Sequence, residues 1–488
     1  MAQQFIRYKN FDGLLNAYTS DFLMQDNELA ACKNVWAYSL GTLEKCSGYS
    51  KASTTQVIDN ASVNYLHHYY QPSSKVDRLL ACSDSGLDYV IEYRTTGDWA
   101  AITSGTHAGR AGAEVDMENF IDKVFVVGYD AGTFLTNATI TGTTMATSDG
   151  TNLTDMAQGK YIIRYKDLLY VLHCYSGATL YPSRVYYSST PTAGAITWTP
   201  ATDFIEFGYD DGDEITGGVE ALDRLIVFKH YSMWKYDESE RKKIADVGCD
   251  SYRSIIKIDQ IPYWTNRFGA WRWRGAAPEL ISAKAQPFFD AIDQTTLGNQ
   301  VATVYNGFEY RVFIGTVTVK GYTYTNAWWC WDTRREKCYI RCTHDVAKSA
   351  CTYIEDQDNV NKQRAYFGND DGYVFKFADK IDEIYADDGN EIDNFFITKN
   401  FDYGVPEDVK FASNMTTFTE NAAGMKVAVD ADYKDQFSED NKQIRSNIDH
   451  LSIASSGNLV KFKFYEKGSG KSWKFNGFII GVDIKEQA

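Results

Sequence analysis

Cysteine and histidine are the first side chains to consider, because these residue types bind metals and act as nucleophiles or bases. The chain has nine cysteines and seven histidines. One stretch brings several together, namely Cys338, Cys342, His344 and Cys351. On one unbroken strand, Cys338, Cys342 and His344 would share a face. Zinc sites, however, usually have pairs of ligands that are closer together in sequence. We therefore favour buried thiols and predict no metal site.

Three acidic turns contain fragments of a calcium-binding loop. They are Asp210-Asp211-Gly212-Asp213-Glu214, Asn369-Asp370-Asp371-Gly372 and Asp387-Asp388-Gly389-Asn390-Glu391. None has the twelve-residue EF-hand pattern with its terminal glutamate. Asp-Gly and Asn-Gly are also common hairpin turns, and we favour that interpretation. The sequence predicts no cofactor.

Signs of catalysis are weak. Ser188 to Trp198 resembles one degenerate copy of the Ser/Asp…Trp turn of sialidase-type propellers. No arginine triad or tyrosine nucleophile can be nominated, and glycosidases need two facing carboxylates. GxSxG, P-loop and GxGxxG-helix motifs are absent. We predict no catalytic residues, and a sialidase-like glycosidase or a glycan-binding propeller is the alternative.

Two tryptophan clusters, Trp271-Arg272-Trp273 and Trp328-Trp329-Cys330-Trp331, could stack sugars or anchor an interface. Packing between sheets is the favoured interpretation, because aromatic residues suit a pleated and half-buried surface.

A recurring strand pattern indicates the scaffold that would position these residues. Seven times a short polar start leads into an apolar strand, usually followed by a turn and an aromatic strand. The starts lie 37 to 56 residues apart, about 48 on average. They are near Val76, Asp122, Asp167, Asp223, Gln260, Glu309 and Gln363. A strand-built period of this length is typical of propeller blades, so we predict an all-β propeller of six or seven blades.

The pattern divides the chain into three parts. Residues 1–50 form a lead-in, with a short helix expected over 26–33 and a hairpin over 35–46 that we expect to close the propeller. Residues 51–395 carry the blades. Residues 396–488 read as a small antiparallel β-sandwich, with the apolar strand at 478–484 in a central position. Residues 1–30 could instead clasp a neighbouring subunit.

The composition of the chain argues against some classes of function. The formal charge is −16 and no Lys/Arg run of five occurs, which argues against a protein that grips nucleic acid by neutralising phosphates. It does not argue against a protein past which DNA slides, since a negative wall repels phosphates. Scattered cysteines indicate reduced thiols and cytosolic synthesis. No signal peptide and no run of 18 apolar residues can be read, so we expect no membrane span.

Three stretches resemble one protein family. The first holds Phe11-Asp12-Gly13-Leu14-Leu15-Asn16, Phe22 to Leu29, Lys33-Asn34-Val35 and Gly41 to Tyr49. The second runs from Arg184-Val185-Tyr186-Tyr187-Ser188 to Thr197-Trp198, with Phe204 soon after. The third is Thr398-Lys399-Asn400-Phe401-Asp402-Tyr403-Gly404. Together they resemble the tail hub or nozzle proteins of short-tailed bacteriophages and related packaged-DNA stabilisation proteins, although the prolines usual in the first stretch are missing.

The resemblance implies a structural virion protein with no catalytic residues. It implies a homo-oligomeric ring, commonly of six copies, beneath the portal and adaptor proteins, where it extends and gates the DNA exit channel. Double-stranded DNA would pass without sequence-specific binding, and the outer surface would dock fibres or spikes. The expected location is the virion tail, after synthesis in the host cytoplasm.

Overall fold

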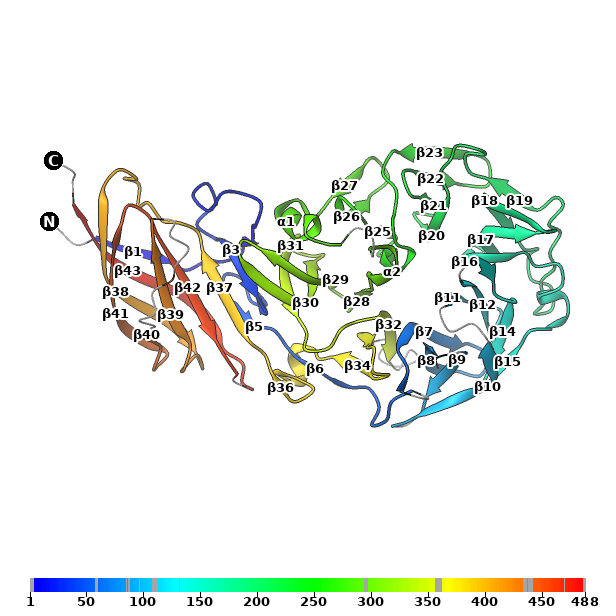
Figure 1. Ribbon diagram of the computed structural model, residues 1–488, viewed down its shortest axis with the longest axis horizontal. Helices are drawn as coiled ribbons and strands as arrows, with labels where there is room; N and C mark the ends of the chain where they lie inside the picture. The colour runs from blue at the N-terminus through cyan, green and yellow to red at the C-terminus, as the bar shows by residue number, and fades with distance from the viewer. Residues whose placement is uncertain are drawn as a thin grey trace.

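The computed structural model describes residues 4–485, except 58, 59, 85, 87, 96, 108–112, 131, 294–296, 356–361, 433–436, 438–441 and 469. Figure 1 shows a ring of small sheets on one side and layered strands on the other, where both chain ends lie. The chain is an all-β propeller with a β-sandwich beside it, as predicted. No helix among the described residues is long and apolar enough to cross a membrane.

Seven blades form the ring, and each consists of four main strands. Blades 1 and 2 hold β7 (Val63–Gln71), β8 (Val76–Asp84), β9 (Tyr89–Arg94) and β10 (Trp99–His107), then β11 (Glu114–Phe120), β12 (Lys123–Asp130), β14 (Ala138–Thr141) and β15 (Thr144–Ala146), with β13 (Thr133–Phe134) beside β12. One residue pair, Thr103 and Thr144, joins the outer strands of these two blades.

The other blades follow in chain order. Blades 3 and 4 hold β16 (Gln158–Tyr165), β17 (Leu168–Ser176), β18 (Thr179–Tyr187) and β19 (Phe204–Glu206), then β20 (Ile215–Ala221), β21 (Arg224–Lys229), β22 (Met233–Tyr236) and β23 (Arg241–Ala245). Blades 5 and 6 hold β24 (Ile256–Ile258), β25 (Ile261–Asn266), β26 (Gly269–Trp273) and β27 (Pro278–Leu280), then β28 (Thr303–Tyr305), β29 (Glu309–Val319), β30 (Tyr322–Asp332) and β31 (Lys337–Cys342). Blade 7 holds β32 (Ser349–Glu355), β33 (Lys362–Gly368), β34 (Val374–Phe377) and β6 (Tyr49–Lys51), with β35 (Ala386–Asp387) and β36 (Asn390–Glu391) attached.

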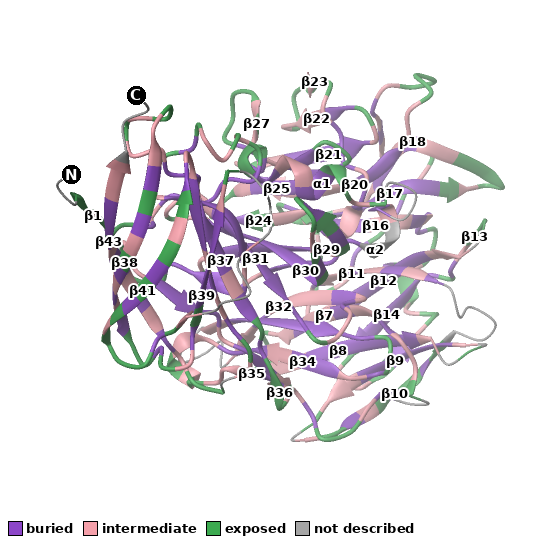
Figure 2. Cartoon of the chain, turned by 60° about the vertical axis from the view of Figure 1, so that its left-hand side comes forward, coloured by how far each residue is buried: buried purple, intermediate pink, exposed green. Residues whose placement is uncertain are grey.

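The apolar strand of each of the seven sequence repeats is the second strand of a blade. These strands are apolar on both faces because the neighbouring blades cover both sides of each sheet. In β12, for example, five consecutive residues from Val124 to Gly128 are buried. Figure 2 shows buried residues along the strands and exposed residues mainly in the connections.

A strand from the N-terminal part closes the ring. β6 pairs with β34 of blade 7, with Tyr49 opposite Phe377. The prediction that the hairpin over 35–46 closes the propeller was wrong, because β4 (Val35–Trp36) and β5 (Leu43–Lys45) join a sandwich sheet through β43 (Lys474–Lys485). The chain therefore leaves the sandwich only after Lys45, a few residues before it enters blade 7.

The sandwich contains two six-stranded sheets. The first holds β4, β5, β43, β38 (Val409–Glu420) and β41 (Ile448–Gly457), with β1 (Gln4–Tyr8) also paired to β43. The second holds β2 (Leu14–Leu15), β3 (Glu28–Lys33), β37 (Asn394–Thr398), β42 (Val460–Glu466), β39 (Lys426–Ala431) and β40 (Lys442–Gln443). The prediction that the last strand is central is confirmed, since β43 pairs with β38 on one side and with β1 and β5 on the other.

The short helix expected over residues 26–33 is absent. Residues 28–33 form β3, which lies between β2 and β37, and five of its six residues are buried. Pairing with two strands outweighs the weak helix preference of this polar segment. In the described part of the chain, short helices lie elsewhere: α1 (Gln286–Asp290), α2 (Leu297–Gln300), and the 3₁₀ segments at 150–152, 252–254, 283–285 and 380–382.

One hydrophobic cluster joins the propeller to the sandwich. It includes Trp329 of blade 6, Phe375 of blade 7 and Phe464 of the sandwich. The β29–β30 hairpin is long and reaches the second sheet, where the Tyr322 and Phe395 rings lie 5.3 Å apart. Because the core is continuous, the two parts are expected to behave as one body.

Candidate functional site

Two cavities lie along the axis of the ring. All seven innermost strands line the larger one, of about 720 Å³. A smaller cavity, of about 450 Å³, lies at one mouth. Tyr161 and Tyr252 line both cavities, and their ring centroids are 4.9 Å apart. The tyrosine pair therefore lies between the two cavities and obstructs the axis.

Residues 252 and 253 connect distant blades across this axis. Tyr252 lies in the 3₁₀ turn before β24, and its hydroxyl donates to the carbonyl of Val115 on β11 at 3.0 Å. The Arg253 Nε donates to the Tyr252 hydroxyl at 3.3 Å. Its Nη1 donates to the carbonyl of Lys348, before β32, at 3.4 Å. Blades 2, 5 and 7 are thus joined at the centre of the ring.

Two carboxyl groups on β11 line the larger cavity. Asp116 accepts hydrogen bonds from the Tyr65 hydroxyl and the Ile162 amide, each at 2.9 Å. Burial raises the pKa of Asp116 to about 6. Burial, with the nearby Asp116 charge, raises the pKa of Glu118 to about 7. These groups therefore titrate near neutral pH, whereas burial raises the pKa of Tyr65 well above its usual value and keeps its hydroxyl protonated.

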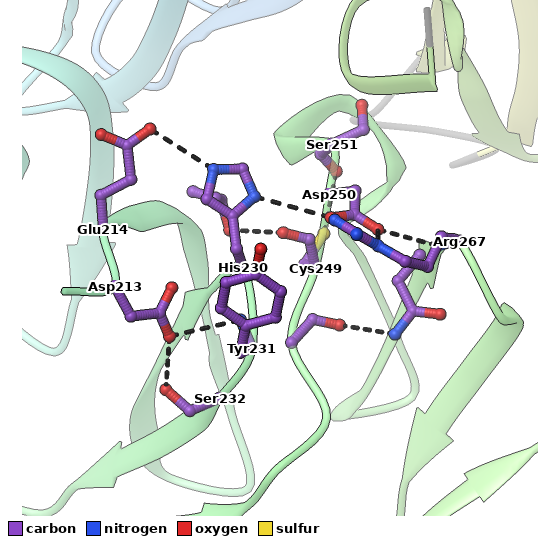
Figure 3. Close-up of polar contacts among 12 residues, drawn as sticks. Asp213, Glu214, His230, Tyr231, Ser232, Cys249, Asp250, Ser251 and Arg267 are labelled. Atoms are coloured by element: carbon purple, nitrogen blue, oxygen red, sulfur yellow. Dashed lines mark hydrogen bonds and ion pairs between the residues drawn. The ribbon is translucent and has the colours of Figure 1, made fainter. Parts of the chain in front are cut away.

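A charged cluster at the mouth links blades 4 and 5 (Figure 3). The His230 Nε2 lies 3.4 Å from a Glu214 oxygen, and its Nδ1 lies 3.5 Å from a carboxylate oxygen of Asp250. The Arg267 side chain donates to both oxygens of Asp250, and its backbone amide donates to Oδ2 at 2.8 Å. Glu214 precedes β20, His230 follows β21, Asp250 precedes β24, and Arg267 follows β25.

The cluster holds its charges across neutral pH. Contacts with Asp250 and then Glu214 raise the pKa of His230 to about 9. The His230 contact lowers the pKa of Glu214 to about 2. Burial opposes ionisation of Asp250, but His230 and Arg267 still hold its pKa well below the usual value. A general acid or base works best with a pKa near the working pH, so this cluster suits a clamp between blades better than proton transfer.

His173 extends the cluster toward blade 3. It sits at a bulge between β17 and β18 with a positive φ of 52°, a backbone conformation that turns a side chain away from its regular position. Its Nδ1 lies 3.1 Å from the carbonyl of Ile215 and 3.9 Å from Glu214. Burial lowers the pKa of His173 to about 4, so it is neutral beside the charged His230.

The three acidic turns do not all have the same role in the structure. Asn369–Gly372 connects β33 to β34, and 387–391 lies in the β35–β36 hairpin, so both are turns as predicted. Residues 210–214 connect blades 3 and 4 instead. There Asp211 pairs with the buried Lys229 at 2.7 Å, and Glu214 joins the mouth cluster.

The structure also places the other residues that the sequence analysis considered, namely the cysteines with His344 and the Ser188–Trp198 turn. All nine cysteines are free thiols; Cys338 and Cys342 are buried, and His344 is exposed, with 62% of its side chain accessible. Among the described residues, no group of three or more His, Cys, Asp or Glu side chains could hold a metal ion. In the Ser188–Trp198 turn, the buried Trp198 donates to the carbonyl of Asn152 at 2.8 Å.

The tryptophan clusters belong to the interior, as the packing interpretation predicted. Trp273, Trp328 and Trp329 are fully buried, and Trp331 nearly so. Trp271 is half-buried and packs against the cluster between blades 4 and 5.

Sequence reasoning did not find the mouth cluster. Its members come from four connections and match no motif. The strand repeats did contain a signal, because the connection before the first strand of an antiparallel blade and the connection after its second strand reach the same rim of the ring.

Comparisons with known proteins give little further information. No family model and no curated protein matches the chain. One solved structure, described as the extracellular domain of a one-component system from B. thetaiotaomicron, aligns with 9% identity and a TM-score of 0.40 over 88% of this chain. The chain spans 58% of the length of that protein.

Proposed function

We propose that the chain is a structural subunit of a phage tail ring, a hub or nozzle. It would extend and gate the DNA exit channel beneath the portal and adaptor proteins and would dock fibres or spikes. The proposal follows from the family resemblance at residues 11–49, 184–204 and 398–404.

One structural observation supports this proposal most directly. The first and third of these stretches lie near opposite ends of the sequence, yet they pair in one sheet. Leu29 of β3, in the first stretch, lies opposite Thr398 of β37, in the third. Two of the three stretches that carry the resemblance thus meet in the second sandwich sheet, whereas the stretch at 184–204 lies in blade 3.

The proposed channel lies between subunits and not through the propeller. The Tyr161–Tyr252 pair obstructs the propeller axis, and a cavity of about 720 Å³ leaves no room for a DNA duplex. The net charge of −16 favours a wall along which DNA slides.

Assembly mass is the test. Native mass spectrometry or mass photometry of the purified chain, and of tail complexes from phage particles, should show a ring, with six copies as the favoured number. Obligate rings have large and permanent contacts, so the ring should persist on dilution. A 55.2 kDa monomer in both preparations would overturn the proposal.

A carbohydrate-active propeller is the second candidate, supported by the carboxyl pair on β11. Asp116 and Glu118 both face the axial cavity, and burial places their pKa values at about 6 and about 7. This candidate predicts that the wild-type chain hydrolyses a glycan and that the Glu118→Gln variant does not. Absence of hydrolysis across a panel of bacterial surface glycans would exclude it.

A further inference from the structure

A lysine, an asparagine and a glutamate meet in the interior of the sandwich. The Lys45 Nζ lies 3.6 Å from Oε2 of Glu466, and the Asn394 Nδ2 donates to the same oxygen at 3.0 Å. Asn394 and Glu466 lie opposite each other on β37 and β42 of the second sheet, whereas Lys45 belongs to β5 of the first sheet. One carboxylate oxygen therefore holds an amine from one sheet and a carboxamide from the other.

This group is shielded from water. The Lys45 side chain is inaccessible, and 7% of the Glu466 side chain is accessible. The indole of the buried Trp473 donates to the same Oε2 at 3.1 Å. The Asn394 Oδ1 is buried and accepts no hydrogen bond from the described residues, although an unmade hydrogen bond of a buried carbonyl is costly. The carboxamide is thus only partly satisfied as it stands.

The three side chains have the chemistry of amide exchange. Burial lowers the pKa of Lys45, which favours the neutral amine, and a lysine amine that is desolvated in this way is a nucleophile. A carboxylate that contacts both nitrogens can accept a proton from one and donate it to the other. With that proton, Glu466 also becomes a hydrogen-bond donor beside the unsatisfied carboxamide.

We propose that Lys45 and Asn394 condense into an isopeptide bond, with Glu466 as the general base and acid. The Nζ forms a bond to Cγ of Asn394, and the bond between Cγ and Nδ2 breaks. Glu466 takes the proton from Nζ and gives it to Nδ2, which leaves as ammonia, so the carboxylate is regenerated. The step needs no oxidant and no cofactor.

The bond would join the two points where the chain passes between propeller and sandwich. Lys45 is the last residue of β5, before the chain enters blade 7 through β6, and Asn394 is the first residue of β37, after the chain has left blade 7. The two crossings run beside each other, since Asp387 of β35 pairs with Tyr49 of β6 (Figure 1). All seven blades lie between residues 45 and 394, so the bond would close the propeller into one covalent loop.

Such a loop would restrict the unfolded chain. A covalent cross-link removes conformational freedom from the unfolded state, and the effect grows with the length of the closed loop. The sandwich would therefore hold both ends of the propeller even when a blade opens. This inference does not depend on the proposed ring, because a single chain can form the bond.

Mass spectrometry of the full-length chain tests the proposal directly. The denatured wild-type chain should be lighter than its sequence by one ammonia. Its protease digest should contain a branched peptide that joins the segments around Lys45 and Asn394. A wild-type chain with its full sequence mass, or with only linear peptides from these two segments, would overturn the proposal.

Matched variants locate the reaction. Lys45→Arg keeps a cation beside Glu466 but supplies no neutral amine, because the guanidinium stays protonated; this variant and Glu466→Gln should both keep the ammonia and lack the branched peptide. The control is Lys461→Arg, at another buried lysine of the sandwich, 3.5 Å from Asp430, and this variant should still lose ammonia. Loss of ammonia that persists in Lys45→Arg would contradict the proposal.

A cut in the propeller provides a second readout that needs no variant. After limited proteolysis between residues 45 and 394, the two fragments should remain joined on a denaturing, reducing gel. Fragments that separate would contradict the covalent loop. Should Lys45→Arg fail to fold, this gel and the branched peptide of the wild type still decide the question.

Discussion

His230 holds a positive charge between two carboxylates, and this arrangement predicts a pH-dependent contribution to stability. Contacts with Asp250 and Glu214 raise its pKa from 6.5 to about 9. A raised histidine pKa stabilises the folded state fully below the unfolded value and loses this effect as pH rises through the folded value. The stabilisation should therefore be present below about pH 6.5 and lost by about pH 9.

Denaturant unfolding of the wild type and of His230→Gln measures this effect. The difference in unfolding free energy should be about 1 kcal/mol at pH 6, because the partly exposed imidazole is screened by solvent, and should decline toward pH 9. In a Glu214→Gln/Asp250→Asn background the pH dependence should disappear. A difference that is constant from pH 6 to 9 would contradict the prediction.

Lys229 is a buried cation whose partner can be removed separately. Its Nζ is inaccessible and lies 2.7 Å from Asp211, which is about one-third exposed. Asp211→Asn leaves a buried charge with only neutral acceptors and should cost about 2–3 kcal/mol of unfolding free energy. Lys229→Met leaves a carboxylate that water can reach and should cost less.

A double-mutant cycle checks this prediction. Adding Lys229→Met to Asp211→Asn should recover part of the lost stability, because the unpaired buried charge disappears. Equal and additive costs for the two single variants would show that the pair is not coupled.

At the level of elements, β6 is the strand that closes the ring. Tyr49 packs against Phe367 and Phe375, and its hydroxyl donates to Asp345 at 2.6 Å. Tyr49→Ala should cost about 3–5 kcal/mol, as for other large buried aromatic residues. It should also expose blade 7 to limited proteolysis.

Tyr49→Phe is the matched control for this prediction. It keeps the ring contacts and loses the hydrogen bond to the Asp345 carboxylate and the one accepted from the Asp345 amide, so it should cost about 1.5–3 kcal/mol. Protease cuts in blade 7 that appear equally in both variants would show that the packing of β6 does not close the ring.

At the level of the whole molecule, the continuous core predicts that propeller and sandwich unfold together. Phe395 contacts Tyr322 and Tyr324 of the β29–β30 hairpin, with ring centroids 5.3 and 6.0 Å apart. Calorimetry of the wild type should show one transition. Phe395→Ala should lower the stability by about 3 kcal/mol and should separate the transition into two. Two transitions already present in the wild type would contradict this coupling.

The strand repeats were predictable because they depend on local pattern. Each second strand is an apolar run, since every blade covers the next one, and this requirement appears in sequence as a period of about 48 residues. The same logic predicted the apolar last strand of the sandwich, which lies centrally between β38 and β1.

Which strands pair with one another was decided only by the tertiary structure. Residues 28–33 form a strand because β2 and β37 lie beside them, and the 35–46 hairpin joins β43, more than 400 residues away in sequence. The mouth cluster gathers His230, Glu214 and Asp250 from separate connections. Local sequence sets which segments are strands, but long-range pairing and the convergence of connections at one rim depend on the closed ring.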